Sequence, residues 1–179
     1  MRFVNVVDAL KLIYSKRETR DFIDKPLPGE VVLKILEAGR LAGSAKNRQP
    51  WHFILIRDKK NLEQLASYGF FAQHLPNASF AVVIAVPDTY EQDRFDAGRA
   101  AQNMMLAAHV LGVGSCPITL HRHEEAKKFL NIPDELKIVI CLAFGYPAQI
   151  RRKGTVIRKQ LLEMLHTEKY GQKPEELTF

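Results

Sequence analysis

The chain has 179 residues, 46% hydrophobic and 26% charged, a length and composition that favour one compact domain with a packed core. This composition excludes a disordered or fibrous chain, and the longest apolar runs, such as residues 80–86, are far shorter than the ~20 residues that span a bilayer. The formal net charge of +6 bears on solubility and loose association, and by itself it predicts neither a fold nor a function.

The hydrophobic pattern predicts alternating helices and strands along the chain. We expect helices over residues 4–15, 28–41, 61–68, 95–111, 124–130 and 156–166, and strands over residues 51–57, 80–86 and 137–144. Residues 80–86 are apolar at every position, which is typical of a strand buried on both faces of a sheet. No repeat, low-complexity tract or linker interrupts the pattern, so we expect residues 1–179 to form a single α+β domain of at most three layers.

The N-terminal segment and the cysteines predict a cytoplasmic location. Residues 1–17 are amphipathic and include an acid, without the apolar stretch and small-residue cleavage site of a signal peptide. Cys116 and Cys141 are far apart, lie outside any CxxC pattern and have apolar neighbours. Such cysteines are typical of buried thiols in a reducing compartment.

The predicted helix over residues 95–111 is rich in small side chains on more than one side, at Ala97, Gly98, Ala100, Ala101, Ala107 and Ala108. A helix that is small or apolar almost all round is expected to be buried on almost all sides. In a chain of this length a second subunit would enclose such a helix, although the central core helix of a monomer would show the same pattern.

The residue types that commonly carry catalysis form no convincing set in this sequence. His121 and His123 have the spacing of a metal-binding pair, but no third ligand follows at a suitable spacing, and a solvated loop is the preferred explanation. Ser115 lacks the GxSxG turn of a nucleophile elbow, and His109 lies on an apolar helix face typical of a core histidine. GxGxxG and GxxxxGK[ST] patterns are both missing. We therefore predict no catalytic side chain and no metal, as in an enzyme whose cofactor carries the chemistry.

Three cations, Lys16, Arg17 and Arg20, follow directly after the first predicted helix. One cation is explained by the negative end of the helix dipole, but three are not. A phosphate is the simplest ligand that uses several, because guanidinium groups pair with its oxygens through two parallel bonds. The segment therefore predicts a phosphate-binding site.

A second polar cluster, SAKNRQP, stands at residues 44–50, immediately before a predicted strand. A loop that only joins a helix to a strand does not need serine, lysine, asparagine, arginine and glutamine together. We interpret this loop as a ligand-binding segment.

Four segments together resemble the nitroreductase family of FMN-dependent oxidoreductases. They are KRETRDF at 16–22, SAKNRQPW at 44–51, FDAGRAAQNMMLAA at 95–108 and AFGYP at 143–147. Their order and spacing match over about residues 8–170, and the NxQPW element with the preceding basic motif is the specific part. The resemblance implies an α+β fold with a central, mostly antiparallel sheet flanked by helices. It also implies an intertwined homodimer with one FMN in each of two interface clefts, and a C-terminal tail, about residues 167–179, that packs on the partner chain.

The resemblance also implies which residues bind the cofactor. The basic motif, Lys16, Arg17 and Arg20, would hold the phosphate and ribityl side and reach the pyrimidine edge of the flavin. The other subunit would contribute Ser44, Asn47 and Gln49. The dimethylbenzene and N5 region would lie beside Pro117, Ile118, Thr119 and Leu120, and a late cation would close on the phosphate, with Arg158 preferred and Lys159 next.

Two positions depart from the family pattern. Glu18 stands where the family usually has a serine, and an acid beside a phosphate repels it unless the side chain points away. Gly43 replaces a proline, which loosens the polar loop. The first departure leaves the contact made by position 18 open.

The implied reaction is two hydride transfers through one site, from NADH or NADPH to flavin N5 and then to an acceptor such as a nitroaromatic or a quinone. Arg20 is the candidate cation that stabilises the reduced flavin near N1 and O2. Phe70, Phe71 and His74 are expected to line the substrate cleft, because the chain lacks the long insertion of larger relatives.

Other classes of function remain open. A module that binds flavin or a nucleotide without turnover would carry the same cofactor residues, and flavin-fragmenting or dehalogenating relatives share the fold. A nucleic-acid binder would explain the net charge, but the aromatic residues do not alternate with the basic ones as a stacking surface requires. We expect neither nucleic acid nor membrane as a partner.

Overall fold

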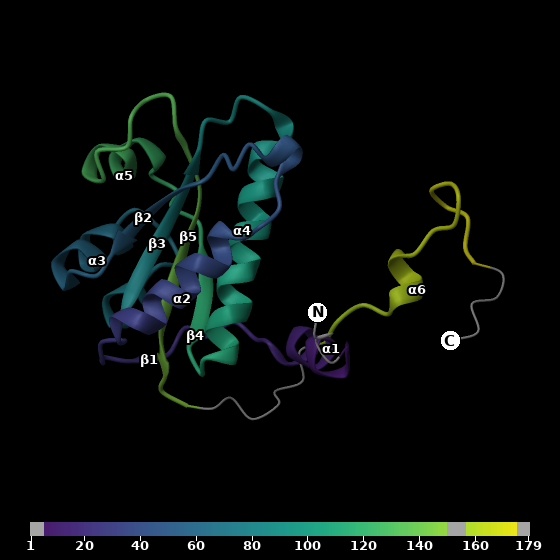
Figure 1. Ribbon diagram of the computed structural model, residues 1–179, viewed down its shortest axis with the longest axis horizontal. Coiled ribbons are helices and arrows are strands. Elements are labelled where there is room, and N and C mark those ends of the chain that lie inside the picture. Colours follow the sequence, from purple (N-terminus) through teal and green to yellow (C-terminus); the bar gives the residue numbers. More distant parts are fainter. Residues whose placement is uncertain (1–5, 150–156, 175–179) are drawn as a thin grey trace. The chain divides into compact units, whose positions relative to one another are not determined.

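The computed structural model describes residues 6–149 and 157–174. The chain divides into two units, residues 1–149 and residues 150–179 (Figure 1). The first unit carries the sheet and most of the helices, and the second carries one short helix. Whether both belong to one domain stays a prediction.

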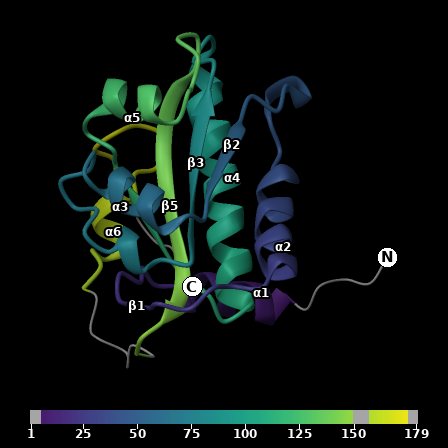
Figure 2. The same cartoon turned by 90° about the vertical axis from the view of Figure 1, so that its left-hand side faces the viewer.

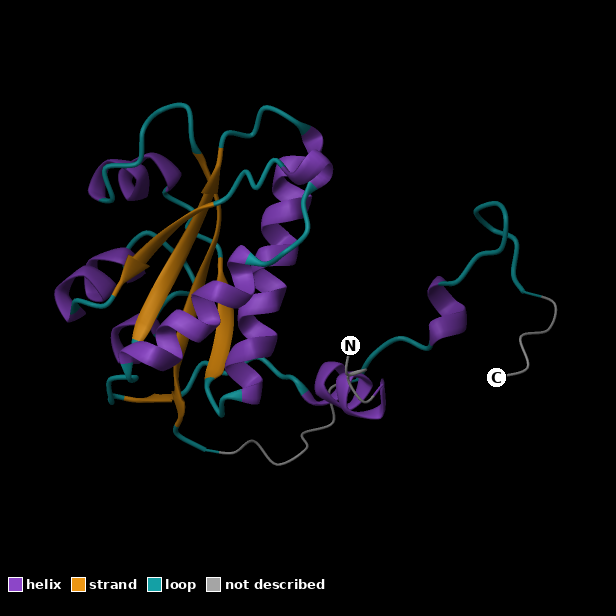
Figure 3. Ribbon diagram, in the orientation of Figure 1, coloured by secondary structure: helices purple, strands orange, loops and turns teal. Residues whose placement is uncertain are grey.

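The sheet of the first unit has five antiparallel strands (Figure 3). They are β1 (Phe22–Ile23), β2 (His52–Ile56), β3 (Phe80–Val86), β4 (Gly114–Ile118) and β5 (Lys137–Pro147). The long strand β5 organises the sheet, because β1, β3 and β4 all pair with it and β2 pairs with β3. Every residue of β3 is buried, so the prediction of a strand covered on both faces is confirmed.

Helices cover both faces of this sheet (Figure 2). On one face lie α2 (Gly29–Arg40) and α4 (Glu91–Val110), and on the other lie α3 (Lys59–Ala66) and α5 (His123–Phe129). The remaining elements of this unit are α1 (Val6–Ser15) and two 3-10 turns, η1 (Ala45–Asn47) and η2 (Leu75–Asn77). The predicted α+β class, with a mostly antiparallel sheet flanked by helices, is therefore confirmed.

Alternation along β3 divides the core into two clusters. Val82 and Ile84 pack with Ile35 of α2 and Met104 of α4, whereas Val83 packs in the cluster that includes α3 and α5. Phe80 and Phe144 stack with ring centroids 4.7 Å apart, which joins β3 to β5 inside the first cluster. The rigid sheet thus has one packed layer on each side.

The structure differs from the sequence-based prediction at several elements. The strands β1 and β4 were not predicted, because β1 is only two residues long and β4, GSCPI, contains glycine and proline. Helix α4 begins at Glu91, four positions before the predicted start, because Asp93 caps it by accepting from the backbone N–H groups of Thr89 and Tyr90.

The central helix α4 is buried on one side only. Its small residues Ala97, Ala100 and Ala101 pack in the core formed with α2 and the sheet. On its other side Phe95 is 68% exposed and Val110 is 67% exposed. Within one chain the helix is therefore not enclosed all round, and an exposed stripe remains.

The second unit contains α6 (Leu161–Met164), which is shorter than the helix predicted over residues 156–166; position 156 lies outside the described residues. Lys173 Nζ donates to the carbonyl oxygens of Leu162, Glu163 and Leu165 at 2.8, 3.2 and 3.4 Å, so it holds the C-terminal end of this helix. No helix in the described parts of the chain has the length and apolar character to cross a membrane.

Candidate functional site

The three cations of the basic segment have three different environments. The Lys16 side chain is 7% exposed, and its Nζ lies 2.6 Å from Glu18 Oε1 and 3.7 Å from Met105 Sδ of α4. Arg17 Nη1 donates to the carbonyl oxygens of Tyr14 and Lys16, both at 2.7 Å, so it holds the C-terminal end of α1 as the dipole explanation predicts. Arg20 is exposed, and among the described residues none forms a hydrogen bond or an ion pair with it.

The basic segment is held against β4 by close backbone packing. The Thr19 N–H donates to the Ser115 carbonyl oxygen at 2.9 Å. A Cβ at Gly114 would lie 2.8 Å from Thr19 Cγ2, so any larger residue there would push the segment away. The cations are thus positioned by the rigid sheet and not by a loose terminus.

Buried polar atoms without a hydrogen-bond partner gather at this segment. In the described part of the chain they are Glu18 Oε2, His74 Nε2 and Ser115 Oγ. Glu18 belongs to the basic segment, Ser115 accepts from its backbone, and the His74 ring lies 6.1 Å from the Phe22 ring. Each such atom costs roughly 1–3 kcal/mol when it is left unpaired. The arrangement therefore suits a polar ligand with several donors and acceptors.

The local charges shift the titration of neighbouring groups. Burial, and then the charge of Arg20, lowers the pKa of His74, so this ring is neutral near pH 7. Burial, together with Lys16 and Arg17, also lowers the pKa of His109, whose Nε2 lies 3.1 Å from Ser15 Oγ. Burial raises the pKa of the Cys116 thiol in spite of the nearby cations, so this cysteine is not a poised thiolate. Positive charge therefore dominates this region.

The polar loop at residues 44–49 adopts a strained conformation. Lys46, Asn47 and Gln49 have φ angles of 52°, 56° and 50°, in the left-handed region that costs non-glycine residues roughly 1–2 kcal/mol each. Ser44 Oγ accepts from the Gln49 N–H at 2.9 Å, which closes the loop on itself. The Asn47 and Gln49 side chains are exposed. Such strain at exposed polar residues is typical of a ligand-binding segment.

Two buried aspartates of α4 hold this loop in place. Asp96 Oδ2 accepts from the Ala45 N–H at 2.9 Å, and Asp93 Oδ1 accepts from Arg48 Nη2 at 3.0 Å. Burial raises the pKa of Asp93, but hydrogen bonds from the Tyr90 N–H, from Arg48 and from the Thr89 N–H together lower it below its usual value. Both carboxylates therefore act as fixed anchors. Sequence reasoning missed them because they lie far along the chain from the loop.

The end of β4 exposes only part of the predicted flavin-contacting run. Ile118 and Leu120 are 3% and 1% exposed, and their side chains pack in the cluster with α3 and α5. Pro117 is half-buried and Thr119 is exposed. A ligand at this edge would meet Pro117, Thr119 and the backbone of the run.

The predicted cleft residues lie beside this edge. Phe70 and Phe71 are 63% and 76% exposed, and both rings contact the ring of His121. A Cβ at Gly69 would lie 2.9 Å from the Thr119 carbonyl oxygen, so the turn before the two phenylalanines packs directly on the end of β4. Sequence reasoning did not identify His121 as a site residue, because its spacing to His123 is that of a metal-binding pair and no local pattern relates it to Phe70. Among the described residues there is no group of three potential metal ligands.

The predicted site residues fall into two separate places of the first unit. One place contains the basic segment, the end of β4 and residues 70–74. Thr119 contacts the turn before Phe70. His74 contacts Phe22, and the charge of Arg20 helps to lower the pKa of His74. The polar loop is bound to Asp96, near the start of α4, whereas Lys16 contacts Met105. These two positions lie about 14 Å apart along the helix. Arg158 and Lys159 are exposed residues of the second unit.

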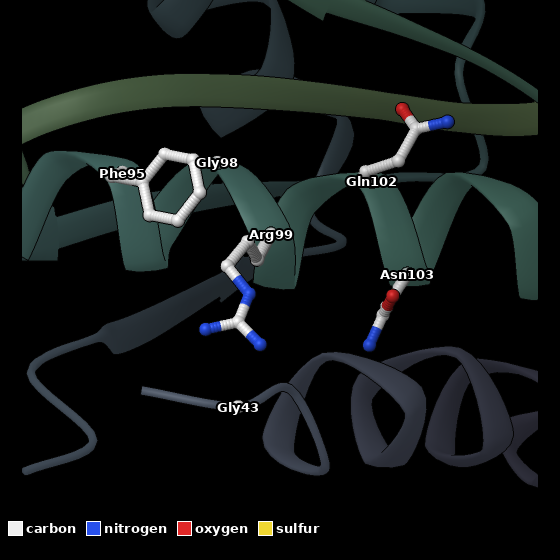
Figure 4. A pocket seen from close by; sticks show the side chains of 6 residues that line it. All are labelled: Gly43, Phe95, Gly98, Arg99, Gln102 and Asn103. Carbon is white, nitrogen blue, oxygen red and sulfur yellow. The ribbon is translucent and has the colours of Figure 1, made fainter. Parts of the chain in front are cut away.

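A shallow groove of about 480 Å³ lies next to the polar loop, on the exposed side of α4 (Figure 4). It is lined by Gly43, Phe95, Gly98, Arg99, Gln102 and Asn103. A Cβ at Gly43 would lie 2.3 Å from Arg99 Nη2, so glycine leaves room for this guanidinium. None of the residues that line the groove belongs to the basic segment.

Known proteins share both the sequence pattern and the fold. The family model described as "Nitroreductase family" matches residues 13–70 and 67–146. A protein of Archaeoglobus fulgidus, provisionally named an NADH dehydrogenase/NAD(P)H nitroreductase, is 38% identical over 149 residues, which cover 78% of this chain and 86% of the relative. The crystal structure of a Parabacteroides distasonis protein with the same provisional name has a TM-score of 0.82 at 28% identity, covering 91% of this chain and 99% of that one.

A structure titled as an FMN-dependent nitroreductase from Clostridium difficile also has a TM-score of 0.82, at 25% identity, and covers 90% of this chain and 99% of that one. The first unit thus has the fold of a class of oxidoreductases, in which helices cover both faces of an antiparallel sheet. The chain belongs to the nitroreductase family. The prediction of an NAD(P)H-dependent oxidoreductase agrees with the names of these relatives.

Proposed function

We propose that this protein is an FMN-dependent oxidoreductase that transfers hydride from NADH or NADPH to a small electron acceptor such as a nitroaromatic or a quinone. One observation carries the proposal. In the described part of the chain the unpartnered buried polar atoms all belong to residues at the basic segment, where the unpaired guanidinium of Arg20 also lies. A flavin mononucleotide combines an anionic phosphate with a ring edge of donors and acceptors, so it matches both features.

The chain's own residues would bind and orient the cofactor. Bound FMN would supply the hydride chemistry at N5. Arg20 would pair with the anionic part of the ligand, and Lys16, which lies against Met105 of α4 and is paired with Glu18, would be a hydrogen-bond donor beside it. The neutral ring of His74 and the hydroxyl of Ser115 would hydrogen-bond to polar ligand atoms, and no side chain of the chain would form a covalent bond.

A complete site would require two chains. The polar loop contacts α4 at Asp96 and the basic segment contacts it at Met105, positions about 14 Å apart along a helix that is packed in the core. This separation supports a site that a second chain completes. In a homodimer, Ser44, Asn47 and Gln49 of one chain would serve the FMN bound by Arg20 of its partner. Exposed apolar residues on α1 and α4, such as Tyr14 at 68% and Phe95 at 68%, would then be covered.

The second unit would take part in the same assembly. Its helix α6 exposes Leu161, Leu162 and Met164, and Tyr170 is 93% exposed. We propose that this tail packs on the partner chain and that Arg158, or else Lys159, closes on the phosphate. Cys116 and Cys141 are buried free thiols, which supports a cytoplasmic location.

The visible spectrum of the purified protein tests the function. We expect absorbance near 450 nm, as for any oxidised flavin, bleaching when NADH or NADPH is added without oxygen, and recovery when a quinone follows. Mass spectrometry of the released cofactor is expected to find FMN and not FAD. A yellow protein that does not bleach would instead be a flavin-binding module, and a colourless protein that FMN does not reconstitute would contradict the proposal.

A further inference from the structure

Three exposed aromatic rings form a fixed surface next to the proposed flavin site. The rings of Phe70 and His121 stack, with centroids 4.1 Å apart and planes inclined by 19°. The ring of Phe71 meets His121 edge-on, with centroids 6.3 Å apart and an angle of 67°. We call Phe70, Phe71 and His121 the aromatic ledge. Its two phenylalanines are among the exposed large apolar residues of the chain.

His121 holds this ledge through a hydrogen bond as well as through stacking. Its Nδ1 accepts from the backbone N–H of Phe70 at 3.2 Å. A histidine whose Nδ1 accepts carries its proton on Nε2 when the ring is neutral. The Phe70 backbone and the Phe70 ring are therefore both fixed by the same imidazole.

The turn that carries Phe70 is joined at two further points to the segment between β4 and α5. The Arg122 N–H donates to the Tyr68 carbonyl oxygen at 3.0 Å. Gly69 packs against the carbonyl oxygen of Thr119, where a Cβ would approach to 2.9 Å. Because these contacts bind the turn to the segment that directly follows a strand of the sheet, the ledge is preorganised before any ligand arrives.

The position of the ledge relates it to the chemistry. Thr119 belongs to the run of residues that is proposed to lie beside the flavin ring. His74 lies on the same segment as Phe70 and contacts Phe22, and the charge of Arg20 helps to lower the pKa of His74. The ledge thus flanks the place where an acceptor would approach the flavin. Exposed phenylalanines held by dedicated contacts indicate a surface that binds apolar, flat molecules.

We propose that His121 is a positioning residue that fixes Phe70 as a stacking surface for planar aromatic electron acceptors. The inference rests on the proposed function and adds a source of specificity to it. A flat acceptor stacks on the ledge and gains affinity, whereas a small inorganic acceptor such as ferricyanide does not use it. Aromatic stacking contributes about two- to tenfold in affinity.

Two substitutions separate the hydrogen bond from the ring. His121→Asn keeps an acceptor for the Phe70 N–H but removes the stacked ring, and His121→Phe keeps a ring but removes the acceptor. His123→Asn is the matched control, because His123 is exposed and makes no contact with the ledge. Phe70→Leu removes the stacking surface itself.

Steady-state kinetics with NADH and either nitrobenzene or ferricyanide test the proposal. We expect both His121 variants and Phe70→Leu to raise the ratio of KM for nitrobenzene to KM for ferricyanide about two- to tenfold relative to the wild type, whereas His123→Asn leaves this ratio unchanged. Combining His121→Asn with Phe70→Leu is expected to add little beyond Phe70→Leu alone, because His121 acts through Phe70. FMN content and thermal stability are expected to match those of His123→Asn.

Equal changes with both acceptors, or an unchanged KM for nitrobenzene in Phe70→Leu, would overturn the role of the ledge. Turnover of ferricyanide by the wild-type protein is the separate test of the proposed function. If the wild type fails it, calorimetric titration of nitrobenzene without NADH still tests the ledge: weaker binding by Phe70→Leu and His121→Asn supports it, and equal binding by all variants contradicts it.

Discussion

The ammonium group of Lys16 lies 2.6 Å from the carboxylate of Glu18. Glu18 therefore neutralises one of the three cations of its own segment. This pair explains how an acid can stand in a proposed phosphate-binding motif. Glu18 points toward Lys16, and Arg20 keeps its charge for a ligand. The second carboxylate oxygen of Glu18 is buried and has no partner among the described residues, so it remains able to accept from a ligand donor.

Replacing Glu18 by glutamine is expected to strengthen FMN binding about two- to fivefold, because the charge of Lys16 is then no longer neutralised by a carboxylate. The effect is modest because the ion pair is only partly buried. Fluorescence titration of the apoprotein measures the affinity. Glu37→Gln is the control, since Glu37 pairs with Arg40 on the surface of α2. Weaker binding by Glu18→Gln would instead mean that Glu18 holds Lys16 in position for the ligand.

Replacing Arg20 by alanine is expected to weaken FMN binding about ten- to a hundredfold, the effect of losing one charge-assisted hydrogen bond. The fold is expected to survive, because Arg20 is exposed and serves no internal contact in the described structure. Circular dichroism and FMN titration of Arg20→Ala and of Arg40→Ala, as a control, check both statements. Equal affinity in the two variants would remove Arg20 from the site.

The proposed homodimer is tested best at Gly98. Ala101 is 5% exposed and packs in the core of its own chain, so a charge there would disturb the fold as well as an interface. Gly98 is exposed on α4, and no atom lies within 4 Å of a Cβ built there. We expect Gly98→Glu to dissociate the dimer and release FMN, because a charge buried at an interface costs several kcal/mol, while the helix itself gains from losing a glycine.

Sedimentation velocity, recorded at a flavin wavelength, measures the outcome for Gly98→Glu. Gly29→Glu is the matched control, because Gly29 is also exposed and open, at the start of α2. A monomeric Gly98→Glu that keeps its full content of FMN would show that one chain forms the whole site.

Stability is expected to depend on pH through His74. Its folded-state pKa is lowered, first by burial and then by Arg20, so the unfolded chain binds a proton there more readily. The contribution to stability is therefore complete above the unfolded pKa of about 6.5 and declines as the pH falls through that value. His109 acts in the same direction. We expect the free energy of unfolding in urea to fall less between about pH 7 and about pH 5 in His74→Gln than in the wild type, with His52→Gln as the control.

Much of the fold could be predicted because its signals are local. The apolar run of β3, the periodicity of α2 and the small and apolar residues of α4 are local features, and the structure confirms these elements. The strand β4 could not be predicted in this way, because its residues Gly114 and Pro117 disfavour a strand and its pairing partner β5 lies elsewhere in the sequence. The two residues of β1 likewise have no pattern of their own and are defined by their partners on β5.

The residues of the candidate site, too, could be predicted where their signal is local and could not where it is not. The clusters at residues 16–20 and 44–49 were visible because their polar residues are consecutive. Asp96 fixes the polar loop and His121 fixes Phe70. In each case the two hydrogen-bonded residues are 51 positions apart in the sequence, so no local pattern indicates the contact. Ile118 and Leu120 were singled out by the family resemblance, but their apolar side chains belong to the core.

The left-handed backbone of Lys46, Asn47 and Gln49 limits how this loop can evolve or be engineered. A β-branched residue at any of the three positions would be opposed by its own backbone conformation, whatever its contacts, whereas glycine and asparagine would be accepted. Asn47→Gly would therefore remove the amide without adding strain, whereas Asn47→Ala would remove the amide and add strain, because alanine tolerates this backbone region less well than asparagine. A more stable but less active Asn47→Gly protein would make this loop a place where activity is maintained at the expense of stability.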